Sequence, residues 1–183
     1  MSTLSIDRHD LALLDALQRS GDATNATLGE AVHLSASQVS RRLQRLQEAG
    51  LITGYTALLD PAALGLDVIA FAHVVLERHG GVRTEAFEEG VAALPEVLEC
   101  FSVSGNADYV LRIVAPDLAA FSELMMKRVL RLPGIANIKT DIVLGKVKQT
   151  HVLPLEHIAR RKKFAPASAN KVCRSASRRE CLM

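Results

Sequence analysis

The chain has 183 residues, of which 49% are hydrophobic and 23% are charged. This length fits one domain or two small ones and excludes a large multidomain enzyme, and the composition is that of a globular chain with a buried core rather than a disordered or fibrous one. No stretch approaches the roughly 18 uncharged apolar residues that cross a bilayer, and the first residues lack the basic and apolar regions of a secretion signal, so we expect a cytoplasmic protein with no membrane partner.

Charge is unevenly distributed along the chain. Residues 1–60 carry a net charge of −2 and residues 61–156 a net charge of −3, whereas residues 157–183 carry +7. The overall charge is therefore poor evidence for nucleic-acid binding. The basic tail, residues 156–183, is predicted to be disordered; a passive solvated extension is the favoured interpretation, and added DNA affinity through counterion release is the alternative.

The three cysteines indicate neither a disulfide framework nor a metal site. Cys100, Cys173 and Cys181 lie far apart, and the sequence has no C-x-x-C motif and no histidine at metal-ligand spacing. We expect reduced thiols, no metal and no cofactor.

Two helices are predicted near the N-terminus. Over residues 7–20, Leu13, Leu14 and Leu17 recur at helical spacing, and Gly21 ends the pattern. Residues 26–32 form a shorter helix that follows a polar segment and places Leu28 toward the first helix.

A third helix over residues 36–49 is the most informative segment. Ser35 followed by Gln38 is a capping-box pattern, and Gly50 supplies a stop signal. One face of this helix is apolar and the opposite face is cationic and rich in hydrogen-bonding groups. We expect its polar residues to bind DNA: Ser35, Ser37, Gln38, Ser40, Arg41, Arg42 and Arg45.

Three helices with a short turn before the last one are typical of a helix-turn-helix, whose final helix enters the major groove of double-stranded DNA. Gln38, Arg41 and Arg45 would face the groove, because Arg pairs with guanine and Gln with adenine, and Arg42 would flank it toward phosphates. The prediction for Arg45→Ala is a loss of about 1–3 kcal/mol of operator binding. An ordinary solvated helix face is the alternative. Residues 51–59 alternate around Gly54 and predict a strand pair, the wing.

Residues 61–67 form a candidate linker with turn chemistry, between a first domain at 4–60 and a second at 68–155. The second domain shows predicted strands at 68–76, 97–104, 109–115 and 135–144 and predicted helices at 84–94 and 117–131. This βαββαβ order predicts a ferredoxin-like α+β fold, and residues 147–153 are a candidate edge strand. Apolar residues on both strand faces indicate that a partner, most simply a second copy, covers the sheet face without helices.

The sequence resembles the Lrp/AsnC (feast/famine) family of transcriptional regulators. The resemblance in the first half rests on residues 6–14, Leu34-Ser35, Arg42-Leu43, Arg45-Leu46, Gly50-Leu51-Ile52 and Gly54-Tyr55; in the second half it rests on Pro95-Glu96-Val97, residues 104–109, residues 132–135, Thr140 and Lys146-Val147-Lys148. It covers about residues 4–155. The resemblance implies a winged helix-turn-helix and a regulatory domain that forms homodimers, which often assemble into octamers. It also implies a small amino-acid effector. It also has limits, since the turn and second helix carry Asp22, Thr24 and Glu30 where the family often has a basic residue.

The resemblance places the effector near the turn after residue 104. The implied effector-binding residues are Gly105, Asn106, Ala107, Asp108, Tyr109 and Thr140. The chemistry of the turn is compatible with an amino acid, because the Asp108 carboxylate suits an ammonium group and free backbone N–H groups suit a carboxylate. Alternatively, Gly105 and Asp108 only form the hairpin and Tyr109 is a core aromatic.

The predicted function is therefore a sequence-specific, effector-modulated DNA-binding regulator that is not an enzyme. One alternative is an amino-acid-sensing oligomerisation module without DNA binding. The other is an enzyme on the same scaffold, since siroheme decarboxylases resemble this family in fold; it would depend on His73, His79 and His151, the histidines of the second domain up to residue 155.

Overall fold

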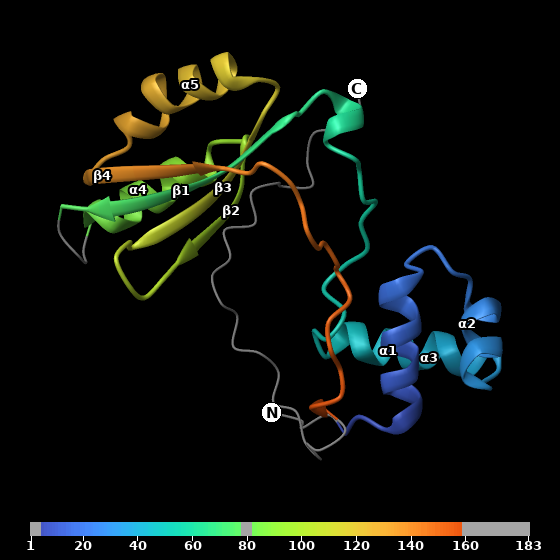
Figure 1. Ribbon diagram of the computed structural model, residues 1–183. Helices are drawn as coiled ribbons and strands as arrows, with labels where there is room; N and C mark the ends of the chain where they lie inside the picture. Colours follow the sequence, from blue (N-terminus) through green and yellow to red (C-terminus); the bar gives the residue numbers. More distant parts are fainter. Residues whose placement is uncertain (1–4, 78–81, 159–183) are drawn as a thin grey trace, which may run out of the picture. The chain divides into compact units, whose positions relative to one another are not determined.

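The structure is a computed structural model that describes residues 5–77 and 82–158. These residues form two compact units (Figure 1). The N-terminal unit comprises described residues up to Leu58 together with residues 148–158, and the second unit comprises the described residues from Leu59 to Val147. Each unit has its own hydrophobic core.

Three helices build the N-terminal unit: α1 (Arg8–Arg19), α2 (Asn25–Val32) and α3 (Ala36–Glu48). Each begins at a residue whose side chain accepts a hydrogen bond from a backbone N–H of the first turn, namely Asp7, Thr24 and Ser35. The predicted helices are thus confirmed to within about two residues. The apolar faces meet in one core: Leu13, Leu17, Leu28, Val32, Val39 and Leu43.

The turn between α2 and α3 depends on a glycine. The Leu34 N–H donates to the Gly29 carbonyl at 2.9 Å, and a Cβ on Gly29 would lie 2.4 Å from the Leu34 carbonyl oxygen. His33 closes α2 in the left-handed conformation, with φ of 56°. This close approach of the backbone fixes how α3 follows α2.

The predicted strand pair over residues 51–59 is wrong. Ile52 packs against the core, but residues 53–60 continue without a strand, and Tyr55, Leu58 and Leu59 are exposed. A lone two-stranded ribbon is marginal without an apolar face to bury, and nothing in the described chain covers one here. The predicted edge strand over residues 147–153 is also wrong, because residues 148–158 leave the sheet and join the N-terminal unit.

Gln18 of α1 holds this returning segment. Its amide Nε2 donates to the Leu153 carbonyl at 3.0 Å, and its Oε1 accepts from the Leu153 N–H at 2.8 Å. Ile158, at the end of the described chain, is buried. Sequence reasoning assigned residues up to 155 to the second domain. The contact of Gln18 with Leu153 could not be seen in the sequence, because partners 135 positions apart leave no local pattern.

The second unit contains a four-stranded antiparallel sheet in the order β2-β3-β1-β4. Its strands are β1 (Val68–Leu76), β2 (Val97–Ser102), β3 (Tyr109–Ala115) and β4 (Ile135–Ile142). The helices are α4 (Val82–Ala92) and α5 (Leu118–Lys127), with short 3-10 turns η1 (Ala62–Leu64) and η2 (Val129–Arg131). The predicted βαββαβ order and α+β fold are confirmed.

Both helices pack on one face of the sheet. Alternate residues of β1, from Val68 to Leu76, are buried and join one cluster with Phe87 of α4 and Phe121 of α5. The intervening β1 residues lie on the opposite face and are only partly buried. Among the described residues, no helix is long and apolar enough to cross a membrane.

Candidate functional site

Helix α3 presents a polar surface opposite its core. Val39, Leu43 and Leu46 are buried, whereas most of the remaining side chains of the helix are exposed. This arrangement follows from the 3.6-residue period of the helix. The exposed members of the predicted DNA-binding set are Ser35, Ser37, Gln38, Ser40, Arg41 and Arg45.

The start of α3 is fixed by a reciprocal cap. Ser35 Oγ accepts from the Gln38 N–H at 3.3 Å, and Gln38 Oε1 accepts from the Ser35 N–H at 2.9 Å. Ser35 and Ser37 hydroxyls lie 3.1 Å apart. The predicted capping box is therefore present, and it commits the carbonyl oxygen of Gln38 while leaving its NH₂ group available as a donor.

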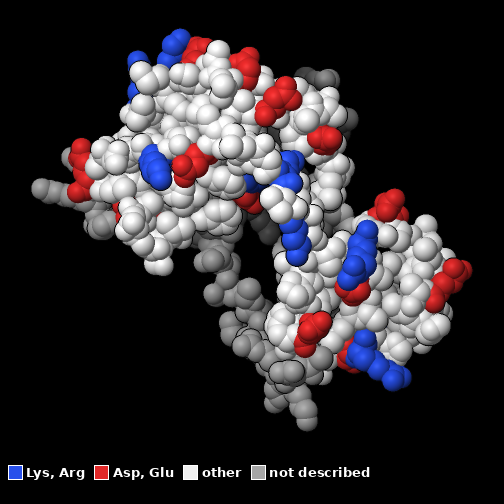
Figure 2. Space-filling model, in the orientation of Figure 1, with Lys and Arg blue, Asp and Glu red and all other residues white. Residues whose placement is uncertain are grey.

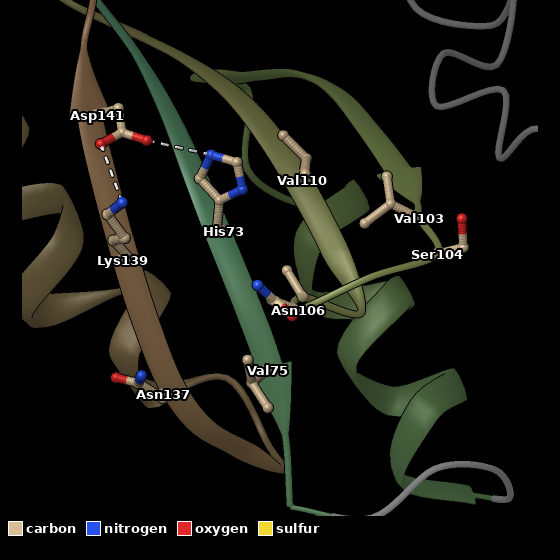
Figure 3. A pocket seen from close by; sticks show the side chains of 10 residues that line it. His73, Val75, Val103, Ser104, Asn106, Val110, Asn137, Lys139 and Asp141 are labelled. Atoms are coloured by element: carbon tan, nitrogen blue, oxygen red, sulfur yellow. Dashed lines mark ion pairs between the residues drawn. The ribbon is translucent and has the colours of Figure 1, made fainter.

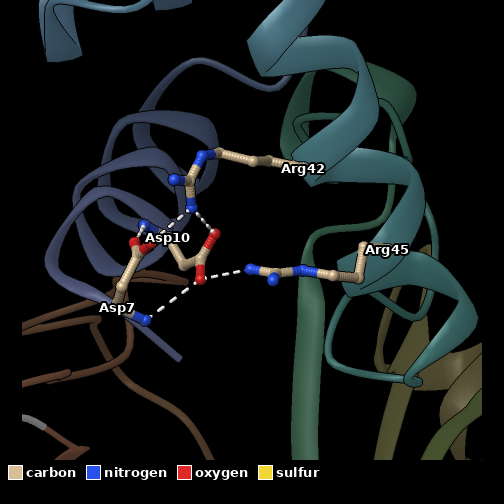
Figure 4. A network of polar contacts seen from close by, with 4 residues as sticks. All are labelled: Asp7, Asp10, Arg42 and Arg45. Carbon is tan, nitrogen blue, oxygen red and sulfur yellow. Dashed lines mark hydrogen bonds and ion pairs between the residues drawn. The ribbon is translucent and has the colours of Figure 1, made fainter. Parts of the chain in front are cut away.

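The three arginines of α3 differ in their partners (Figure 4). Arg42 Nη1 lies 2.7 Å from both Asp7 Oδ2 and Asp10 Oδ1, and Arg45 Nη2 lies 2.5 Å from Asp10 Oδ2. The Asp10 side chain is completely buried, while the side chains of Arg42 and Arg45 are 23% and 44% exposed. Hydrogen bonds to Asp7 and Asp10 raise the pKa of the Arg42 guanidinium.

Arg41 is exposed and has no ion pair within the part of the chain that the structure describes. It lies on the face of α3 turned away from the core, as does Gln44, whose amide donates to Glu48 at 2.9 Å. Figure 2 shows acidic and basic side chains interspersed on the visible face, with no continuous basic patch.

A pocket of about 500 Å³ opens on the sheet face that lacks helices (Figure 3). It lies where the β2–β3 turn approaches the middle of β1 and β4. The lining residues are His73, Val75, Val103, Ser104, Asn106, Ala107, Val110, Asn137, Lys139 and Asp141.

Ionisable and apolar groups line this pocket together. His73 Nε2 lies 3.3 Å from Asp141 Oδ2, and Lys139 Nζ lies 3.9 Å from Asp141 Oδ1. The antiparallel register brings these residues together because His73 is paired with Lys139 and points to the helix-free face. A carboxylate, an ammonium group and a valine wall can together bind a small zwitterion with an apolar side chain.

The structure places the six predicted effector residues at different locations. Asn106 and Ala107 line the pocket, and Gly105 lies in the same turn with φ of 136°, a conformation that favours glycine. Asp108 turns its carboxylate to the Leu76 N–H, which donates to Oδ2 at 2.8 Å. Thr140 lies opposite Ala72, a fully buried residue of the helix-covered face, so its position on β4 is on the other side from the pocket.

Tyr109 belongs to the core beneath the helices. Its ring packs on Phe87 with centroids 4.9 Å apart, and its hydroxyl donates to Glu88 Oε1 at 2.6 Å. Desolvation, together with the hydrogen bond to Glu88 and its charge, raises the pKa of Tyr109. Its role in the structure is the core aromatic that the sequence left open as an alternative.

Five polar pocket residues were not predicted as effector-binding: His73, Ser104, Asn137, Lys139 and Asp141. The last three alternate along β4, and this period of two was a signal for one polar strand face. Sequence reasoning named His73 only as a residue on which the enzymatic alternative would depend. Among the described residues, no group of three or more His, Cys, Asp or Glu side chains could hold a metal ion.

Cys100 on β2 is expected to be an unreactive thiol. Although the residue is exposed, partial desolvation and the Glu88 carboxylate raise its pKa to about 11 from an ordinary value of 9.0. Since the thiolate is the nucleophile, iodoacetamide should alkylate Cys100 about 100-fold more slowly at pH 8 than an ordinary cysteine. The pH–rate profile of a Cys173→Ser/Cys181→Ser variant measures this; a midpoint near 9 in the folded protein would contradict it.

Each of the two units matches a known protein-family model. Residues 6–53 match the family model described as winged helix-turn-helix DNA-binding, and residues 69–153 match the Lrp/AsnC ligand binding domain. The two matches follow each other along the chain and together span most of the described residues.

Known proteins resemble the chain over most of its length. Leucine-responsive regulatory proteins from Klebsiella pneumoniae and Escherichia coli K12 are 37% identical over 151 residues, which are 82% of this chain and 92% of theirs. A Neisseria meningitidis transcriptional regulator, solved as a complex with L-Met, has 37% identity and a TM-score of 0.81, covering 84% of this chain and 99% of that one. An AsnC family regulator from Agrobacterium tumefaciens has 32% identity and a TM-score of 0.79, with the same coverage.

Proposed function

Since the chain belongs to the Lrp/AsnC family of transcriptional regulators, we propose that it binds specific sites on double-stranded DNA through α3 and responds to a small amino-acid effector. The observation that carries the proposal is α3 itself, a capped helix whose apolar face is buried and whose exposed face carries Gln38, Arg41 and Arg45. The proposal places Ser35, Ser37 and Ser40 near phosphates or base edges. We further propose that the protein is not an enzyme and acts in the cytoplasm.

The effector would occupy the pocket on the helix-free sheet face. Asp141 suits the ammonium group of an amino acid, Lys139 suits its carboxylate, and Val75, Val103 and Val110 suit an apolar side chain. The Neisseria relative solved with L-Met supports an apolar amino acid. In this arrangement Asn106 and Ala107 contact the effector, whereas Gly105 and Asp108 shape the turn, and Tyr109 and Thr140 support the sheet from the other side.

A homodimer would cover the helix-free face of the sheet. The helix-free face leaves Phe101 50% exposed and Val103 37% exposed, and its β1 residues are only partly buried. A second copy packed on this face would bury these apolar groups and pair two α3 helices for a palindromic DNA site. Assembly of dimers to an octamer remains the family-based expectation.

The test is a fluorescence-anisotropy titration with a duplex that the protein selects from a random pool. The titration is run at two salt concentrations, with and without an equimolar mixture of amino acids. Saturable binding that survives unrelated competitor DNA and shifts with the mixture supports the proposal. Binding without any amino-acid response removes the effector part. If the protein binds no duplex, the oligomerisation module without DNA binding is favoured. Absorbance changes on adding a tetrapyrrole would favour an enzyme.

Asp141→Asn should weaken the amino-acid response. Loss of the carboxylate removes a charge-assisted contact to the ammonium group, and such contacts contribute about 1.5–3 kcal/mol, equal to about 10- to 100-fold in affinity. Titration of L-methionine against the protein–DNA complex measures the shift. Glu123→Gln, which removes an exposed carboxylate paired with Lys127 on α5, is the control and should respond as the parent does. Equal responses of all three proteins would exclude Asp141 from the effector site.

A further inference from the structure

The recognition helix carries three arginines, and one buried carboxylate engages two of them. Asp10 has no exposed side-chain surface, and its two oxygens accept from Arg42 Nη1 at 2.7 Å, from Arg45 Nη2 at 2.5 Å and from the Asp7 N–H at 3.0 Å (Figure 4). These contacts join the first turn of α1 to the middle of α3, 32 and 35 positions away.

The charges of this cluster cancel. Asp7 and Asp10 oppose Arg42 and Arg45, and Asp7 adds a second acceptor for Arg42 at 2.7 Å. Arg41 is then the cation of α3 that the described residues leave uncompensated. The three arginines of α3 carry three formal positive charges, but the aspartates offset two of them. The net positive charge that these arginines present to a DNA duplex is therefore much smaller.

A held arginine behaves differently from a free one. Arg42 has a side-chain exposure of 23%, so its guanidinium is largely committed to the two aspartates. Arg45 is 44% exposed and uses Nη2 for Asp10, so its other N–H groups remain available in a fixed direction. Holding a donor fork in place lowers the ordering cost of a directed hydrogen bond, while the nearby negative charge weakens attraction to phosphates.

We propose that Asp10 is a specificity-determining residue of the DNA-binding surface, which acts through Arg42 and Arg45 rather than by touching DNA. Phosphate contacts add affinity for every sequence, whereas base contacts distinguish one sequence from another. By offsetting one positive charge of α3 and fixing the direction of Arg45, Asp10 lowers affinity for unrelated DNA and keeps Arg45 for a base edge. This inference rests on the proposed function, because it concerns the DNA that α3 contacts.

The dependence of binding on salt separates this role from a purely structural one. Each phosphate that a cation neutralises steepens the slope of log K against log salt by about 0.9. Asp10→Asn keeps the size of the side chain and removes its charge, which releases Arg45, while Asp7 still holds Arg42. The slope should steepen by about 0.9, and the ratio of affinities for the selected duplex and a scrambled duplex should fall at least about 10-fold. A variant that is merely destabilised would lose affinity without a steeper slope.

Asp15→Asn is the matched control. It makes the same charge change on the same helix, but it breaks an exposed pair with Arg19, whose side chain is 61% exposed. We expect its slope and its affinity ratio to stay close to those of the parent protein. Equal changes in Asp10→Asn and Asp15→Asn would overturn the proposal, because they would reflect net charge alone.

Arg45→Gln keeps the proposal testable if Asp10→Asn does not fold. Arg45 is half-exposed, so this substitution leaves the core intact. The charge of Arg45 is already cancelled, so the salt slope should not change, while the affinity ratio should fall at least about 10-fold. A slope that becomes shallower by about 0.9 would overturn the proposal, since Arg45 would then be an ordinary phosphate contact.

The double variant Asp10→Asn/Arg45→Gln should bring the slope back close to the parent value, because the released cation is gone. A parent protein that prefers no duplex over a scrambled one would instead refute the proposed function. The inference about Asp10 alone is refuted if the parent protein is selective and Asp10→Asn shows the same selectivity and the same salt slope.

Discussion

Replacing Arg41 by alanine is expected to weaken binding to the selected duplex by about 1–3 kcal/mol, provided that the arginine contacts a base. Arg41 is exposed on the outer face of α3, and the described residues offer it no ion pair. A free guanidinium in the major groove can donate two hydrogen bonds to guanine, and alanine removes both. Equilibrium anisotropy titrations of parent and variant measure this loss, and sequence preference at one position of the site should relax with it.

Arg19→Ala controls for the loss of a positive charge. Arg19 lies in the last turn of α1 and pairs with Asp15 at 3.0 Å in solvent, and such exposed pairs contribute little. We expect the affinity of this variant to stay within about threefold of the parent. If Arg41→Ala and Arg19→Ala bind equally well, Arg41 is not part of the DNA-binding surface.

Phe87→Ala should lower the free energy of unfolding of the second unit by about 3–5 kcal/mol. Phe87 is fully buried, lies at the centre of the core between α4 and the sheet, and packs on the Tyr109 ring. The cavity left by its ring cannot be filled by neighbours held in strands. Because the N-terminal unit has a separate core, its amide resonances should remain those of a folded helical unit when denaturant unfolds the second unit of the variant.

Met126→Ala provides the comparison on α5. Its side chain is 64% exposed, so a change within about 1 kcal/mol is expected for a surface position. Similar losses in Phe87→Ala and Met126→Ala would show that the assigned core is incorrect. If the native amide resonances of both units of Phe87→Ala are lost at the same denaturant concentration, the two units do not unfold independently.

Much of the fold follows from local sequence patterns. The leucines of residues 7–20, the Ser35 and Gln38 cap, and the β-branched run at Val68–Leu76 predicted elements that the structure contains with similar bounds. The alternation of strands and helices then predicted the βαββαβ order and the α+β class. Such signals are visible in the sequence because the helix repeats about every 3.6 residues and the strand every two, so each pattern depends on residues that are near neighbours in the chain.

The sites were less well defined by the sequence. It left two roles open for Asp108, a ligand contact or the hairpin itself, and in the structure its carboxylate accepts the Leu76 N–H. It treated Arg42 as a phosphate contact, although Asp7 and Asp10 hold it. It also did not identify the pocket residues His73 and Asp141, which lie 68 positions apart and meet only across the β1–β4 pairing.

The sequence by itself determined the helices, the strands, their order and the polar face of α3, since each depends on residues close together in the chain. The tertiary structure alone decided which arginine of α3 is free, which groups share the pocket, and that residues 148–158 return to Gln18 on α1. The physical reason is that hydrogen bonds and ion pairs act over a few ångströms in space, and partners separated by 32 to 135 positions in the chain come within that range only after folding.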